Sequence, residues 1–409
     1  MASEIVLVNL SGDDQLGLMS MLTSTLARFQ VRILDVGQAV IHDQLNVGML
    51  VQIIRGDDTA RVLEELEDRT RSLGISARFS RISEADYEEW VASHGKPRWI
   101  VTLLANGFTG EQMAAITGII SRHHLNIDSI RRLTGRVPLS SAEGRERTSI
   151  EMSLRGHLAS PKALKAELLD AADRLIFDFS VQEDTVYRRN RRLVAFDMDS
   201  TLIDAEVIDE LARIHGVGEQ VAAITERAMR GEIQFQQSFR ERAARLRGLP
   251  ETALKAVAES VVLNEGADRL IRALKHFGYR TAIISGGFQY VGEHLQRALG
   301  IDYVFANRLV IRDGIMTGEV DGPIIDADRK AELLKEIAER EGISLQQTIA
   351  VGDGANDLPM LSTAGLGVAY HAKPLVKETA SHAISNFGLD SVLYLLGFSD
   401  RDLDTVFGS

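Results

Sequence analysis

Cysteine is absent from the 409 residues of this chain, and the absence excludes several functions at once. Without thiols the chain forms no disulfide, has no thiolate zinc site and uses no cysteine nucleophile. Any bound metal is therefore expected to have oxygen or imidazole ligands. Proline is scarce, with 7 residues, and hydrophobic and charged residues make up 45% and 25% of the chain. This composition is average for a soluble globular protein and argues against disordered or fibrous architectures.

Long apolar runs and a basic N-terminal segment are also lacking. No stretch of about 18 uncharged apolar residues occurs, which is the length that a membrane-spanning helix needs. The first ten residues have no basic segment before their short apolar run, unlike a secretory signal. We therefore expect a cytoplasmic protein without a membrane partner.

Basic residues are outnumbered, since 46 lysines and arginines face 58 acidic residues, for a net charge of −12. This balance disfavours nucleic acid or an anionic membrane as the main partner. The chain is also longer than the roughly 250 to 300 residues at which a single core stops growing, so several domains are expected.

Hydrophobic periodicity in the first part of the chain indicates alternating strands and helices. The pattern predicts strands at 5–10, 31–41, 47–54 and 76–81, with helices at 16–29 and 59–73. The same β-α-β-β-α-β order recurs between residues 99 and 182, which indicates an internal repeat. This order is typical of a ferredoxin-like α+β sandwich.

The turn that opens the first predicted helix contains Asp14, Gly17 and Leu18. With these residues, the repeated pattern over 1–182 resembles the ACT domain family of amino-acid-sensing modules. The resemblance implies two regulatory ACT-like domains, a homodimer formed through them and an effector site near Gly17. In the second copy, Glu111 occupies the position that corresponds to Gly17 in the first. Glycine is common at helix starts without any ligand, so a purely structural role for Gly17 stays open.

These observations predict four segments of the chain. The segments are 1–94 and 95–182 as ACT-like domains, 183–192 as a polar, arginine-rich and solvated linker, and 193–409 as a third domain.

A short buried-type strand at 193–196 leads directly into Asp197 and Asp199. In open α/β sheets ligands bind at this carboxyl end of the strands. One carboxylate can attack phosphorus, while the other protonates the departing oxygen and later deprotonates water. A Mg²⁺ ion would offset the repulsion between these carboxylates and a phosphate dianion.

Three further elements have similar positions. A second strand ends in Ser285, Gly286 and Gly287, whose hydroxyl and amide groups can form an anion cradle. Lys330 begins a helix after Asp326 and Asp328, which are both plausible N-cap residues. Such a lysine is usually solvated, unless it lies near the active edge of the sheet.

The last element follows a strand at 348–351, where Asp353 and Asp357 lie four residues apart at the start of a helix. Their carboxylates can share one face beside the end of the first strand. An Asp-Gly turn would explain Asp353 but leaves Asn356 and Asp357 unexplained.

The four elements together resemble the haloacid dehalogenase superfamily over residues 193–397. The resemblance implies a Rossmann-like parallel sheet and a phosphatase that forms an aspartyl phosphate. Its implied roles are Asp197 as nucleophile, Asp199 as general acid and base, Ser285 and Lys330 as phosphoryl ligands, Asp197, Asp353 and the Met198 carbonyl as Mg²⁺ ligands, and Asp199 and Asp357 as indirect supports of the ion.

A helical insert at about 203–263 follows the nucleophile strand, where a lid can exclude water. Glu206, Met229, Phe235 and Arg242 reproduce the cap spacing of the phosphoserine phosphatase family. This resemblance implies that Glu206 accepts from the substrate ammonium and that Arg242 clamps its carboxylate. It further implies that Met229 and Phe235 shield the site and that Asn356 and Gly286 orient the substrate.

We thus expect an α/β fold: a Rossmann-like parallel sheet with a helical cap inserted after its first strand, preceded by two ferredoxin-like domains. The resemblance implies Mg²⁺-dependent hydrolysis of O-phospho-L-serine, the last step of serine biosynthesis, with feedback from L-serine through the ACT-like domains. Two alternatives are a phosphatase or phosphomutase for another small phosphate ester, and a metabolite-binding regulator with a degenerate core. Glu206 and Arg242 argue against the first, and the intact set of Asp197, Asp199, Lys330 and Asp353 against the second.

Overall fold

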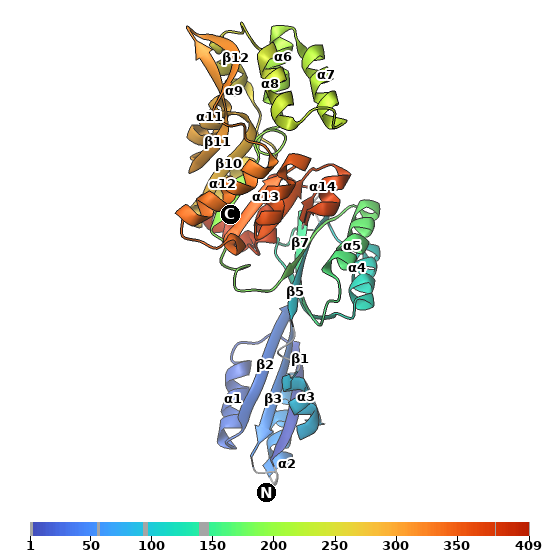
Figure 1. The fold of residues 1–409 in the computed structure, drawn as a ribbon. Helices are drawn as coiled ribbons and strands as arrows, with labels where there is room; N and C mark the ends of the chain where they lie inside the picture. The colour runs from blue at the N-terminus through green and yellow to red at the C-terminus, as the bar shows by residue number, and fades with distance from the viewer. Residues whose placement is uncertain (1–2, 55–57, 93–96, 139–146, 381, 409) are drawn as a thin grey trace. The chain divides into compact units, whose positions relative to one another are not determined.

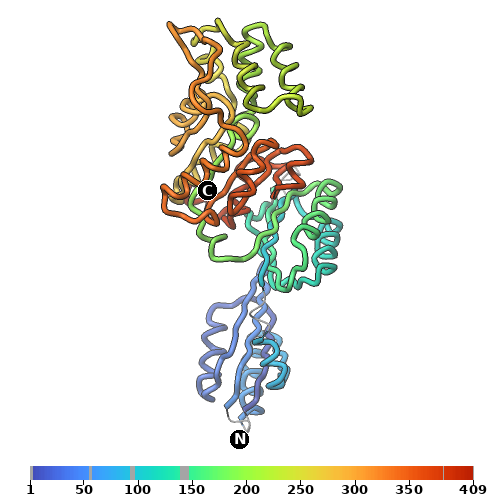
Figure 2. Tube along the Cα trace, viewed as in Figure 1, coloured from blue at the N-terminus to red at the C-terminus, as the bar shows by residue number. Residues whose placement is uncertain are grey.

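The computed structural model describes residues 3–54, 58–92, 97–138, 147–380 and 382–408 (Figure 1). The chain forms two compact units, Met1–Lys96 and Pro97–Ser409, whose path is traced in Figure 2. The predicted boundary between residues 94 and 95 lies outside the described residues. No helix in the described ranges is long and apolar enough to cross a membrane.

The first unit is a four-stranded antiparallel sheet in the order β2-β3-β1-β4. Its elements are β1 (Glu4–Asp13), α1 (Leu18–Arg28), β2 (Arg32–Ile41), β3 (Gln44–Ile53), α2 (Thr59–Ser72), β4 (Ser76–Ile82) and α3 (Glu84–Ala92). Alternate residues of β1 and β3, such as Val8 and Met49, are buried against Leu22 of α1 and Leu66 of α2. Helix α3 is not predicted from the sequence, because none of its side chains is buried and its amphipathic signal is weak.

The second unit is built on a sheet of eleven strands in the order β12-β11-β10-β9-β13-β14-β15-β8-β5-β7-β6. The strands are β5 (Arg98–Asn106), β6 (Asn126–Arg132), β7 (Arg147–Arg155), β8 (Asp178–Glu183), β9 (Leu193–Phe196), β10 (Arg280–Phe288), β11 (Tyr303–Arg312), β12 (Ile315–Asp321), β13 (Thr348–Gly352), β14 (Leu366–Tyr370) and β15 (His382–Ile384). The strands from β11 to β15 through β10, β9, β13 and β14 pair in parallel. The predicted Rossmann-like sheet is therefore confirmed.

Helices cover both faces of this sheet, as buried parallel strands require. The helices of the second unit are α4 (Gly110–Arg122), α5 (Pro161–Leu175), α6 (Val207–His215), α7 (Gly218–Met229), α8 (Phe235–Arg245), α9 (Glu251–Ser260), α10 (Ala267–His276), α11 (Gln289–Leu299), α12 (Ala327–Arg340), α13 (Leu358–Thr363), α14 (Pro374–Thr379), α15 (Val392–Leu395) and α16 (Asp400–Phe407). Val194 and Phe196 of β9 pack with α10 and α11, while Leu193 and Ala195 pack with α12 and α13. Helices α6 to α9 occupy the segment between β9 and α10, and α8 packs on the β11–β12 hairpin (Figure 1).

Strands β5 to β8 and helices α4 and α5 repeat the element order of the first unit, but their sheet is not separate. Strand β8 pairs antiparallel with β15 at Phe179 and Ala383, which joins this repeat to the parallel sheet. Its own core lies between the sheet and the two helices, with Leu103 and Met152 against Ile116 and Leu168. The second repeat is thus continuous with the rest of the second unit.

The segment 183–192 is mostly exposed, but two of its arginines are buried, which differs from the expectation that its arginines are solvated. Arg188 and Arg191 are only 7% and 6% exposed. Arg188 forms an ion pair with Glu151, and Arg191 Nη2 donates to Gln182 Oε1 at 2.9 Å. Charge alone indicates solvent exposure, but the junction between the two sheet portions buries Arg188 and Arg191 and gives each one an acceptor.

An ion pair at the same junction predicts a measurable stability effect. Arg147 donates to both carboxylate oxygens of Asp390 at 2.7 and 2.8 Å, and its side chain is only 24% exposed. We expect Arg147→Ala to lower the free energy of unfolding by about 2 to 3 kcal/mol, since it leaves a buried carboxylate without its main partner. Arg213→Ala, which breaks an exposed pair with Glu210, should cost less than about 0.5 kcal/mol. Equal shifts in urea melts of the two variants would contradict this expectation.

Candidate active site

The turn after β9 is closed by its own backbone. Asp197 N donates to Val351 O at 2.9 Å, and Asp197 Oδ1 accepts from Met198 N at 2.7 Å. The Met198 carbonyl accepts from the backbone N–H groups of Thr201, Leu202 and Ile203 at 3.3, 2.9 and 3.1 Å. These three bonds occupy the carbonyl oxygen of Met198, and its role as a Mg²⁺ ligand stays a prediction.

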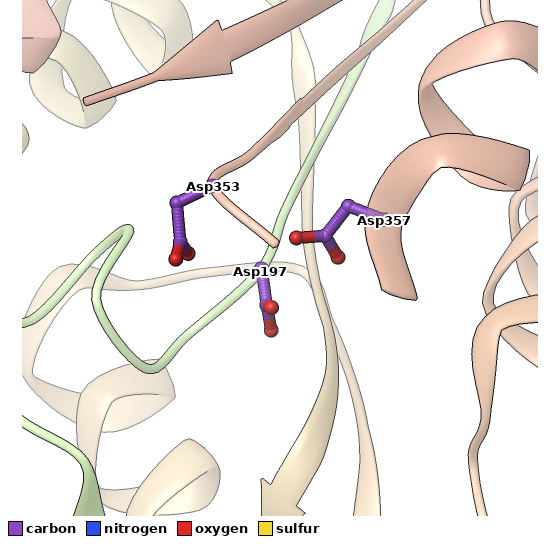
Figure 3. Close-up of side chains that lie close together, drawn as sticks. All are labelled: Asp197, Asp353 and Asp357. Atoms are coloured by element: carbon purple, nitrogen blue, oxygen red, sulfur yellow. The ribbon is translucent and has the colours of Figure 1, made fainter. Parts of the chain in front are cut away.

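Three carboxylates converge at the carboxyl ends of β9 and β13 (Figure 3). Oxygens of Asp197, Asp353 and Asp357 lie within 4.8 Å of one another. Thr201 Oγ1 donates to Asp353 Oδ1 at 2.8 Å, and Gly354 N donates to Asp357 Oδ2 at 3.0 Å. Parallel pairing of the two strands explains the convergence, since it brings residues distant in sequence to one edge.

Lys330 supplies a positive charge to this cluster. Its Nζ lies 2.7 Å from Asp197 Oδ2 and donates to Asp357 Oδ1 at 2.6 Å, and the residue is 0% exposed. Burial by itself lowers the pKa of Lys330, but the two carboxylates outweigh it and raise that pKa above its ordinary value. The lysine is therefore charged, and it is not the solvated helix residue that its local sequence suggests.

Asp199 lies in surroundings that disfavour its charged form. Burial, and then the negative charges of Glu206 and Asp197, raise the pKa of Asp199 well above its usual value. Its Oδ1 accepts a 3.4 Å bond from Val207 N. A carboxyl group that keeps its proton in this position can donate it to a leaving group.

The predicted anion cradle lies at the end of β10. Ser285 Oγ accepts from Gly287 N at 2.9 Å. A Cβ atom at Gly287 would overlap Asp199 Oδ2 and approach Met198 Cε to 2.8 Å. Glycine is therefore required here because the turn passes directly over the carboxyl group of Asp199.

Opposite charges face the cavity from the cap side. Ser200 Oγ donates to Glu206 Oε1 at 2.8 Å, and burial raises the pKa of Glu206. Arg242 Nε is buried and has no hydrogen-bond partner in the described part of the chain. Burial lowers the pKa of Arg242, against the attraction of Asp209 and Glu206. A carboxylate and a guanidinium with free hydrogen-bonding capacity fit a zwitterionic ligand.

The cavity between these groups has a volume of about 210 Å³. It is lined by Asp197, Asp199, Glu206, Ile208, Phe235, Phe239, Arg242, Ser285, Gly286, Gly287, Asp353 and Asn356. Met229 is 69% exposed and lies outside this lining, so its shielding role stays a prediction. Gly17 is in the first unit.

Several residues of the site were not assigned from the sequence. Phe239 lines the cavity and stacks on Phe235 with ring centroids 6.2 Å apart, a contact that their i, i+4 spacing on a helix could have indicated. Thr201 stands four residues after Asp197 in the same motif, but its bond to Asp353 depends on the pairing of β9 and β13. Ile208 also lines the cavity, but its apolar side chain gives no indication in the sequence of a place in the site.

Comparison with known proteins connects this site to a family. Residues 194–362 match the haloacid dehalogenase-like hydrolases, and residues 4–80 match the ACT domain. The phosphoserine phosphatase SerB2 of Mycobacterium tuberculosis is 37% identical over 98% of this chain and 94% of its own length. A phosphoserine phosphatase of Streptomyces coelicolor is 39% identical over 98% of this chain and 93% of its own.

Comparison with solved structures indicates the same family. A probable phosphoserine phosphatase from Vibrio cholerae is similar with a TM-score of 0.58 and 33% identity, covering 76% of this chain and 88% of its own. A haloacid dehalogenase family hydrolase from Salmonella enterica reaches a TM-score of 0.61 at 32% identity, covering 73% of this chain and 98% of its own.

The close approach at Gly287 gives a direct test of the site geometry. We expect Gly287→Ala to lower kcat/KM by about a hundredfold, because the added methyl group displaces Asp199 or the cradle by a fraction of an ångström or more. Gly110→Ala is the matched control, since a Cβ there meets no atom within 4 Å. Steady-state kinetics on protein shown to be folded by circular dichroism would reveal the difference, and full activity of Gly287→Ala would contradict the geometry.

Proposed function

The chain belongs to the phosphoserine phosphatase family of haloacid dehalogenase-like hydrolases, and we propose that it hydrolyses O-phospho-L-serine through an aspartyl-phosphate intermediate with Mg²⁺ as cofactor. The observation that carries this proposal is the pairing of two carboxyl groups at the floor of the cavity. Asp197 is held by Lys330, whereas Asp199 is half-buried, has no ion pair in the described structure and has a raised pKa.

The proposed reaction has two steps. A carboxylate oxygen of Asp197 attacks phosphorus and displaces the serine oxygen, which takes the proton of Asp199. Asp199, now ionised, accepts a proton from a water molecule that attacks the phosphorus of the aspartyl phosphate. The P–O bond to Asp197 breaks, phosphate leaves, and both carboxyl groups return to their starting states. Lys330 and Ser285 bind the phosphoryl oxygens in both steps.

The donor set at the strand ends fits Mg²⁺, which prefers carboxylate and water oxygens. Asp197 and Asp353 would hold the ion, while Asp357, already bonded to Lys330 and Gly354, would support the cluster from beside it. Three carboxylates within 4.8 Å exceed the single charge of Lys330, which favours a cation between them. When bound, Mg²⁺ supplies charge neutralisation for the phosphoryl oxygens.

Selection of the substrate would come from the cap side of the cavity. Glu206 would accept from the ammonium group of phosphoserine, and Arg242 would bind its carboxylate with two parallel N–H groups. Phe235 and Phe239 would cover the apolar part of the ligand, and Asn356 and Gly286 would orient it.

Single-turnover kinetics can distinguish the proposed roles of Asp197 and Asp199. Asp197→Asn should reduce turnover to background and leave no phosphoenzyme, because an amide oxygen does not attack. Asp199→Asn should slow both formation and hydrolysis of the intermediate, by about a hundredfold or more each, because one group serves both steps. A normal first step in Asp199→Asn would contradict its double role, and phosphate release by Asp197→Asn would exclude it as nucleophile.

Arg242 should determine specificity more than chemistry. For phosphoserine, Arg242→Ala should lower kcat/KM by roughly ten- to a hundredfold, the worth of a charge-assisted bidentate pair. A phosphomonoester without a carboxylate should be hydrolysed almost as before. Arg240→Ala, on the exposed side of the same helix, is the control. Equal losses on both substrates would mean that Arg242 only stabilises the cap.

The first unit is proposed to form a homodimer and to bind L-serine as a feedback effector, in the manner that its ACT domain suggests. Its edge strand β2 exposes Ile33, Val36, Val40 and Ile41, and exposed edges are normally paired or covered. Gly17, at the start of α1, has a φ of 87°, and a Cβ there would meet no atom within 4 Å. The turn is thus open to a ligand. A cytoplasmic location likewise stays a prediction.

Serine inhibition tests this regulatory proposal. L-serine should inhibit the full chain several-fold to a hundredfold without competing with phosphoserine, the usual range of coupling between sites. Residues 97–409, cut before β5 so that β8 stays in its sheet, should remain active but lose the inhibition. Gly17→Ala should weaken it, whereas Gly74→Ala, equally left-handed and open, should not. Inhibition that persists in the truncated chain would contradict the proposal.

A further inference from the structure

A buried asparagine outside the cavity lining connects two segments that end in the site. Asn307 lies on β11 and is 2% exposed. Its Nδ2 donates to Gly286 O at 2.8 Å, and its Oδ1 accepts from Ile325 N at 2.9 Å. One side-chain amide therefore bonds both the anion cradle and the backbone that enters α12.

The cradle needs this bond because the sheet does not hold it. Strands β10 and β11 pair at Ile284 and Phe305 and again at Phe288 and Asn307, with an irregularity between the two positions. The three residues 285–287 of β10 face a single residue of β11 and fall outside the regular ladder. Their peptide groups are set instead by side chains.

The bond to Gly286 O also fixes the direction of the next N–H group. The carbonyl of Gly286 and the N–H of Gly287 belong to one planar peptide and point in opposite directions. When Asn307 holds the oxygen on one side, the hydrogen points to the other side, where it bonds Ser285 Oγ at 2.9 Å. The asparagine thus orients the amide and the hydroxyl that form the cradle.

The second bond, from Ile325 N to Asn307 Oδ1, positions the start of the helix that carries Lys330. Ile325 directly precedes Asp326, whose side chain caps α12 by accepting from Arg329 N at 3.0 Å. Lys330 N donates to Asp326 O at 2.9 Å in the first turn of the same helix. Holding Ile325 therefore sets the start of the helix that carries the catalytic-site lysine.

We propose that Asn307 is a positioning residue for phosphoryl transfer, which fixes the distance between the Ser285–Gly287 cradle and Lys330 by bonding Gly286 in the cradle and Ile325, just before the helix that carries the lysine. The inference rests on the proposed assignment of these groups to the phosphoryl group. Because neither of its side-chain bonds reaches Glu206 or Arg242, Asn307 should affect every phosphomonoester to a similar extent and should not change the preference for a substrate carboxylate.

The test uses the full-length protein and two variants. Asn307→Asp keeps the acceptor for Ile325 N but places an oxygen against Gly286 O, and Asn307→Ala removes both bonds. The matched control is Gln112→Glu. Gln112 is a 7% exposed amide that also donates to a backbone carbonyl, Leu175 O, and accepts from a backbone N–H, Thr109 N, both at 2.9 Å.

The informative readout is the inhibition constant of inorganic phosphate, which does not depend on how much of the protein is folded. Both Asn307 variants should raise this constant about tenfold or more and lower kcat ten- to a hundredfold on phosphoserine and on a phosphomonoester without a carboxylate. Gln112→Glu should change neither, even if its melting temperature falls.

The outcomes separate the inference from its premise. Unchanged phosphate inhibition in both Asn307 variants, or their failure to yield any active enzyme, would reduce Asn307 to a structural residue and overturn the proposal. Ser285→Ala tests the premise, since it should also raise the inhibition constant. If Ser285→Ala weakens phosphate inhibition and the Asn307 variants do not, only the role of Asn307 is wrong. If Ser285→Ala has no effect, the cradle assignment fails and the inference with it.

Discussion

The charge balance around Lys330 is the constraint on which the site depends. One buried ammonium group contacts Asp197 and Asp357, while Asp353 lies within the same cluster of carboxylates. Burying so many charges is costly unless each finds a partner. The sheet makes this arrangement possible, because parallel pairing of β9 with β13 and β10 holds the strand ends at one edge. A divalent cation would neutralise the remaining negative charge of the cluster together with that of a bound phosphoryl group.

The same environment separates the two aspartates of the β9 turn. Asp197 lies beside the lysine, whereas Asp199 is half-buried near Glu206 and has no direct cationic partner in the described structure. Although a single residue separates them in the sequence, their electrostatic surroundings differ. Such a difference allows one carboxyl group to act as a nucleophile and its neighbour to hold a proton.

The two ferredoxin-like repeats are connected to the rest of the chain in different ways. The first belongs to a compact unit of its own, with β2 as an uncovered edge. The second shares its sheet with the parallel strands, and its junction contains the Arg147–Asp390 and Arg188–Glu151 ion pairs.

The amino-acid sequence by itself determined the family and the fold class, and it predicted most of the candidate site. Its motifs stand at strand ends and helix starts, where short-range patterns are strong, so Asp197, Asp199, Ser285 and Asp353 could be chosen from local context, whereas Lys330 could be chosen only from the resemblance of the four motifs together. Only the tertiary structure decided what depends on pairing between distant segments. The burial of Arg188 and Arg191, the bond from Thr201 to Asp353 and the two bonds of Asn307 each join elements far apart in the chain. The Met198 carbonyl is a further example. It accepts three backbone N–H groups in a turn whose geometry cannot be read from the residue types alone.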